Sequence, residues 1–98
     1  MSEPVLAAAD VDAALAEQGI AWERQDDQLT TTVTLRDFAG ALAFVNEVGA
    51  AAEAANHHPD IDIRWNKVHL VLTTHDAGGL TVLDLALAAA IDRLRPLR

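Results

Sequence analysis

The apolar residues of this 98-residue chain change their spacing along the sequence, and that change limits the folds the chain can adopt. An interval of three or four residues places side chains on one face of a helix. Three segments show this interval: 7–18, 38–56 and 82–95. In the second segment the residues expected on one apolar face are Phe38, Leu42, Val45, Val48 and Ala52. The first helix is expected to end at Gly19 and the last helix before Pro96, because glycine and proline commonly stop helices. Thr34 or Asp37 can cap the second helix, and Thr81 can cap the third.

Between these segments the spacing falls to two, as it does in strands whose side chains alternate between two faces. Apolar and polar residues alternate over 20–35, where Asp26-Asp27 forms the predicted turn. They alternate again over 61–74, and Asn66-Lys67 is a plausible two-residue turn there. We expect one face of the third strand to carry three apolar residues: Ile61, Ile63 and Trp65.

The order α-β-β-α-β-β-α predicts one α+β domain over 1–98. Strands joined by short turns form an antiparallel sheet, and this four-stranded sheet needs three helices packed on one face to bury its apolar side. The outer side of the second helix is rich in alanine and includes Gly40 and Gly49. Such small residues permit close approach of another helix, either within the chain or from a second subunit.

Charge and composition exclude several classes of function. The net charge of −8 repels phosphate backbones and anionic lipid headgroups, so we expect no nucleic-acid or membrane partner. The chain contains no cysteine, which excludes disulfides, thiolate metal sites and cysteine nucleophiles. No apolar stretch reaches the roughly 18 residues of a membrane span, and the first residues lack a basic signal-peptide region. We expect a cytoplasmic protein.

Three of the four histidines lie where regular structure is predicted to end. His57 ends the second helix, and Glu53, four residues earlier on the same helical face, could orient its ring or form only an ordinary exposed pair with it. Pro59 forces His58 into an extended conformation, so the two adjacent rings point differently. His75 follows the last strand and could join them over one pocket as an acid or base near neutral pH.

Asp84 lies in the first turn of the last helix, where it could accept a hydrogen bond from a histidine ring, complete a capping box with Thr81, or do both. His69 falls in mid-strand and is expected to be a packed or surface residue. Three histidines and a carboxylate are a plausible zinc set. Adjacent histidines lack the spacing of four residues that places two ligands on one ion, so we expect no metal site.

Several of these residues together match a longer motif: Glu53-x-x-x-His57-His58-Pro59, then Trp65, His75 and Asp84 after five, nine and eight intervening residues. In this motif the chain resembles the pterin-4a-carbinolamine dehydratase family. The resemblance extends through Asn56, Asn66-Lys67-Val68-His69 and Thr74-His75, and it covers essentially the whole chain.

The resemblance implies a fold with a four-stranded antiparallel sheet and three helices on one face, and an assembly into homodimers or homotetramers. It also implies an enzyme, a hydro-lyase that removes water from a 4a-hydroxytetrahydropterin to give the quinonoid dihydropterin. The pterin is then the substrate, no bound cofactor is expected, and an aromatic amino-acid hydroxylase is the functional partner. Relatives with other roles serve as a dimerisation cofactor of a transcription factor or as an assembly chaperone for a carboxylating enzyme.

By the same resemblance, His57 and His75 act as general acids at the C4a hydroxyl, while His58 binds the pterin or handles the N5 proton. Glu53 and Asp84 orient these rings. The remaining expected substrate-binding or supporting residues are Pro59, Trp65 and Thr74. The intact histidine set argues against a purely structural descendant, and a zinc-binding module is the third alternative.

Overall fold

The computed structural model describes residues 3–96. Its elements follow in the order α1 (Ala8–Gln18), β1 (Glu23–Gln25), β2 (Gln28–Thr34), α2 (Phe38–Ala55), β3 (Asp60–Arg64), β4 (Lys67–Leu72) and α3 (Val82–Asp92). The predicted α-β-β-α-β-β-α order is therefore confirmed. None of the helices within 3–96 is long and apolar enough to cross a bilayer.

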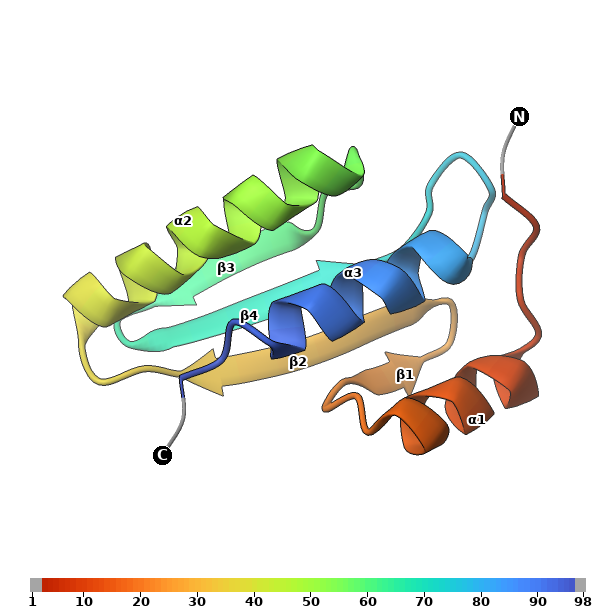
Figure 1. Ribbon diagram of the computed structural model, residues 1–98, viewed down its shortest axis with the longest axis horizontal. Helices are drawn as coiled ribbons and strands as arrows, with labels where there is room; N and C mark the ends of the chain where they lie inside the picture. Colours follow the sequence, from red (N-terminus) through yellow and green to blue (C-terminus); the bar gives the residue numbers. More distant parts are fainter. Residues whose placement is uncertain (1–2, 97–98) are drawn as a thin grey trace.

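The four strands form one antiparallel sheet in the order β1-β2-β4-β3, and the helices lie over one of its faces (Figure 1). Alternate residues of β2 and β4, such as Leu29 and Leu72, are buried beneath the helices. The residues between them, such as Thr32 and His69, pair across the strands on the helix-free face. Burial of each large aliphatic side chain contributes roughly 1.5–3 kcal/mol, so this layer is the main source of stability.

The first strand is shorter than predicted, and the third lies one residue earlier than predicted. β1 begins at Glu23, and in the segment before it the Ala21 N–H and the Trp22 indole N–H both donate to the Asp92 carboxylate at the end of α3 instead of to a neighbouring strand. β3 ends at Arg64, so the prediction that Trp65 shares a strand face with Ile61 and Ile63 is wrong.

The turn between β3 and β4 is Trp65-Asn66, one residue earlier than predicted. Asn66 is held there by Leu35, which donates its N–H to the Asn66 carbonyl and accepts from the Asn66 side-chain amide. Lys67 therefore pairs with Arg64 and begins β4. Trp65 takes a φ of 53° and is 68% exposed.

The buried face of α2 also differs from the predicted spacing. Phe38 and Leu42 are 49% and 42% exposed, whereas the core side of the helix carries Ala41, Phe44, Val48 and Ala52. Leu42 precedes Phe44 by two residues, about 200° around the helix, and so faces away from the core. No atom lies within 4 Å of a Cβ built on Gly49, so within the described residues no other helix packs closely there.

Candidate active site

The ends of three elements meet at one end of the molecule (Figure 1). Because α2 and α3 run antiparallel, the C-terminal end of α2 lies beside the N-terminal end of α3, and β4 ends next to both. A pocket of about 220 Å³ opens there, lined by Asn56, His57, His58, Thr73, Thr74, His75 and Asp76. The structure thus brings all three of the candidate catalytic histidines to one pocket.

Asn56 determines how the chain leaves α2. It adopts a left-handed conformation, with φ 50°, and its N–H bonds to the Glu53 carbonyl, while the His57 N–H bonds to the Ala52 carbonyl. These two bonds form a Schellman motif, which ends a helix and reverses the chain. His57 therefore points back toward α3 instead of continuing along the helix surface.

The His57 ring pairs with Asp84. The distance from His57 Nε2 to Asp84 Oδ1 is 2.6 Å, and the two side chains are 10% and 0% exposed. The prediction that Asp84 accepts from a histidine ring and also completes a capping box with Thr81 is confirmed. The predicted pairing of Glu53 with His57 is wrong, because the reversal at Asn56 removes His57 from the helical face that Glu53 occupies.

Glu53 instead pairs with His58. The Glu53 Oε2 atom bonds to His58 Nε2, and both side chains are largely exposed. Pro59 follows His58 and does not line the pocket; its effect is to keep His58 extended, so that this ring turns back toward the outer side of α2. The two adjacent histidines thus have different carboxylate partners, one buried and one at the surface.

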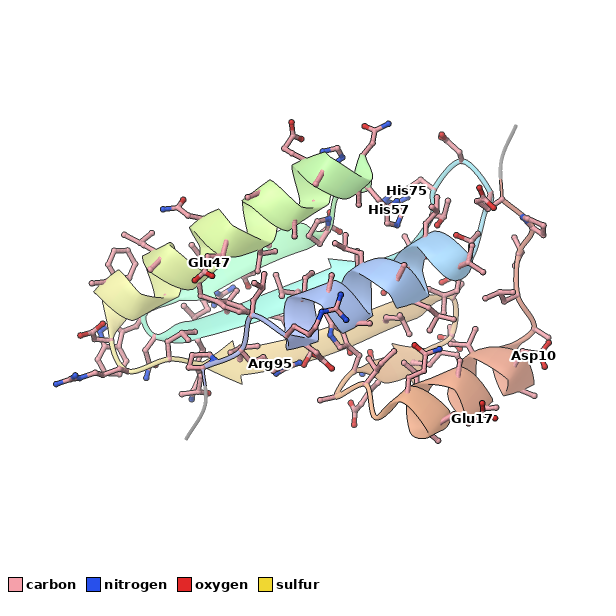
Figure 2. The ribbon with its side chains drawn as sticks, viewed as in Figure 1. Asp10, Glu17, Glu47, His57, His75 and Arg95 are labelled. Atoms are coloured by element: carbon pink, nitrogen blue, oxygen red, sulfur yellow. The ribbon has the colours of Figure 1, made fainter. Side chains whose placement is uncertain are left out.

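His75 reaches the pocket from the loop that follows β4. Figure 2 shows its side chain next to that of His57, between the end of α2 and this loop. The loop is closed by hydrogen bonds from the Gly78 N–H to the carbonyls of Thr74 and His75, with Gly78 at a φ of 80°. Such a positive φ favours glycine, so the Gly78-Gly79 pair shapes the loop that carries His75.

Behind the histidines lies a buried group of hydroxyls. Thr74 Oγ1 donates to Asp84 Oδ2 at 2.8 Å and lies 2.9 Å from Thr81 Oγ1. The sequence predicted Thr81 only as a helix cap, and its place beside Thr74 depends on how the start of α3 packs against the end of β4. Asn56 was likewise not predicted as a site residue, although an asparagine directly after a helix is a known stop signal.

Two further residues lie elsewhere. Trp65 is at the far end of β4, a strand of six residues that spans roughly 20 Å, so it is not part of this pocket. His69 is on the helix-free face of the sheet, in a larger hollow of about 490 Å³, with its Nδ1 2.9 Å from Thr32 Oγ1. Among residues 3–96, no three histidine, aspartate or glutamate side chains are grouped to hold a metal ion.

Comparison with known proteins agrees with this geometry. The sequence profile of the family described as Pterin 4 alpha carbinolamine dehydratase matches residues 4–94. A protein of Chloroflexus aurantiacus with the provisional name pterin-4-alpha-carbinolamine dehydratase is 52% identical over 91 residues, which cover 93% of this chain and 97% of the relative. A protein of the same provisional name from Thermosynechococcus vestitus is 47% identical over 89 residues, 91% of this chain and 93% of that protein.

Solved structures share the fold. A transcriptional coactivator/pterin dehydratase from Brucella melitensis superposes with a TM-score of 0.86 at 26% identity, over 94% of this chain and 99% of that one. A pterin dehydratase-like protein identified as a RuBisCO assembly factor in the alpha-carboxysome gives a TM-score of 0.63 at 22% identity, over 79% of this chain and 89% of that one, and shows the fold alone. The profile match and the close relatives together establish that this chain belongs to the pterin-4-alpha-carbinolamine dehydratase family.

Proposed function

We propose that this protein is a hydro-lyase that removes water from a 4a-hydroxytetrahydropterin to give the quinonoid dihydropterin. The observation that carries the proposal is the nearly buried His57–Asp84 pair, which opens on the same pocket as His58 and His75. Membership of the family and the names of the close relatives support this choice. An aromatic amino-acid hydroxylase would supply the substrate.

The reaction breaks the bond between C4a and its hydroxyl oxygen. Hydroxide is a poor leaving group, so a general acid must protonate this oxygen as the bond breaks, and water then departs. The N5 proton passes to a base, and the electron pair of the N5–H bond forms the C4a=N5 double bond of the product. The site therefore needs one imidazolium and one neutral base close together.

His57 suits the acid. Its Nε2 is committed to Asp84, so Nδ1 is the nitrogen that donates a proton to the C4a oxygen. The Asp84 carboxylate compensates the positive charge that the imidazolium carries. His75 lies beside His57 and is exposed, and we assign it as a second acid that flanks the same hydroxyl.

His58 suits the base. When this ring is neutral, its Nε2–H donates to Glu53 and its Nδ1 carries a lone pair that can accept the N5 proton. Because both partners are largely exposed, the proton can then pass to water. Glu53 orients His58 in this scheme, and Asp84 orients His57.

The test is steady-state kinetics on His57→Ala, His75→Ala, their double variant and His58→Ala, with circular dichroism to check folding. Loss of a general acid lowers kcat by about 10²-fold, and the loss is smaller if the remaining imidazole can replace the missing one. The double variant is slower than either single variant. His58→Ala lowers kcat and raises KM. A chelator leaves the wild-type rate unchanged. Wild-type turnover in the folded double variant would overturn the assignment and favour a binding role for the fold.

We also propose that the protein is a homodimer or homotetramer. Phe38 and Leu42 leave apolar surface on the outer side of α2, and Gly49 faces no neighbour there within the described residues. Light scattering at micromolar concentration measures the mass directly, and a value near the 10.5 kDa of one chain would contradict the proposal.

A further inference from the structure

Thr81 makes one contact that helix capping does not require. As the N-cap of α3 it accepts a hydrogen bond from the Leu83 N–H at 3.2 Å. Its hydroxyl is also 2.9 Å from the hydroxyl of Thr74, which belongs to a different element. Thr81 is fully buried, so water cannot replace this second partner.

The hydrogens of this group can be placed in only one order. Each threonine hydroxyl has one hydrogen to donate. Thr74 donates its hydrogen to Asp84 Oδ2, so the hydrogen between the two hydroxyls must come from Thr81. The chain of donation therefore runs from Leu83 N–H to Thr81, from Thr81 to Thr74, and from Thr74 to Asp84.

This chain determines how the Asp84 carboxylate is turned. Oδ2 accepts from both Thr74 and the Thr81 N–H, which hold that oxygen on the side of α3 and β4. The other oxygen, Oδ1, is then directed at His57 Nε2. A carboxylate aligned in this way accepts a hydrogen from His57 Nε2 and leaves Nδ1 for the pocket.

We propose that Thr81 is a positioning residue of the site, whose hydroxyl acts through Thr74 and Asp84 to keep the hydrogen of neutral His57 on Nε2. Its kinetic effect rests on the proposed dehydratase function, because only then does Nδ1 face a substrate hydroxyl. Its effect on the His57 ring does not depend on that function.

The test is ¹⁵N NMR of the histidine rings in the full chain, at a pH where they are neutral, with the His57 signals assigned from their loss in His57→Gln. Wild type shows the Nε2–H tautomer of His57. Thr81→Val, which keeps the shape but lacks the hydroxyl, shifts the signals toward a mixture of tautomers. Thr81→Ser restores the wild-type signals, and Thr30→Val, the same change on the helix-free face of the sheet, leaves them unchanged.

Two further variants separate positioning from capping. Thr81→Gly places glycine at the N-cap, where it is well tolerated, but removes the hydroxyl. This variant therefore shifts the His57 tautomer even if Thr81→Val fails to fold. In a Thr74→Val background, where the chain of donation is already broken, Thr81→Gly adds no further shift. An unchanged His57 spectrum in folded Thr81→Gly, or a full additional shift in the double variant, would overturn the proposal.

Activity provides the last comparison. If the dehydratase function holds, Thr81→Gly lowers kcat about tenfold with little change in KM. Thr81→Ser, which keeps the hydroxyl, retains most of the wild-type kcat. A wild-type protein without dehydratase activity would refute the proposed function, yet the NMR comparison would still decide the role of Thr81.

Discussion

Asp84 is a buried carboxylate whose two oxygens connect different parts of the molecule. One accepts from His57, and the other accepts from the Thr74 hydroxyl and the Thr81 N–H. Glu53 makes a similar bond to His58 but is 78% exposed. The loss of one partner from a buried charged bond costs more than the loss of an exposed one, because water cannot take the place of the missing group.

Asp84→Asn tests this difference at the scale of one residue. The amide keeps the shape, but it replaces an accepting oxygen with a donor and cannot accept from both sides. We expect the free energy of unfolding to fall by about 1–3 kcal/mol and kcat to fall at least tenfold. Glu53→Gln is the matched control, with a loss of stability of about 0.5 kcal/mol or less. Urea unfolding and steady-state kinetics measure both, and equal effects in the two variants would contradict the argument.

At the scale of elements, the position of His57 depends on how α2 ends. The left-handed conformation of Asn56 turns the chain so that His57 faces α3 and His58 returns to the outer side of α2. The histidine pair was evident in the sequence, but the partner of each ring was not. Spacing along a helix predicts neighbours only while the helix continues, and here it ends at Ala55, two residues before His57.

Asn56→Gly and Asn56→Ala separate the backbone from the side chain, since both remove the amide that lines the pocket. Glycine adopts a positive φ freely, whereas alanine is strained there by roughly 1 kcal/mol. We therefore expect the alanine variant to unfold more readily than the glycine variant and to have the lower kcat. Thermal unfolding and kinetics on both proteins check this expectation, and it fails if alanine is tolerated as well as glycine.

At the scale of the whole molecule, the periodicity of the sequence was sufficient to predict the element order, the antiparallel sheet and the face that the helices cover. It did not predict that α2 and α3 lie antiparallel, with the end of one beside the start of the other (Figure 1). That arrangement decides which residues meet in the pocket, and it places Trp65 at the opposite end of the sheet. Exposure of Phe38 and Leu42 was also missed, because an apolar spacing does not reveal which of two possible faces is buried.

The two ends of α3 have separate tasks. Its first turn supplies Asp84 to the pocket, and its last residue, Asp92, accepts from the Ala21 N–H at 2.6 Å and from the Trp22 indole N–H at 3.0 Å. Asp92 also bonds to Arg95. These contacts connect the end of α3 to the segment between α1 and β1. The eleven residues of α3 span about 16 Å, so this connection lies well away from the histidines.

Asp92→Ala should therefore reduce stability without affecting catalysis. The change leaves the indole N–H of Trp22, a residue only 4% exposed, without its acceptor, and we expect the free energy of unfolding to fall by about 2 kcal/mol. The matched control is Asp12→Ala, which breaks an exposed ion pair with Arg24. The hydrogen bond from Arg24 lowers the pKa of Asp12, but the pair is exposed to water, so this substitution should change the free energy of unfolding much less. Urea unfolding gives the stabilities, and kcat measured well below the unfolding transition should equal that of wild type in both. A loss of kcat in folded Asp92→Ala would show that the two ends of α3 are coupled and that the separation argued above does not hold.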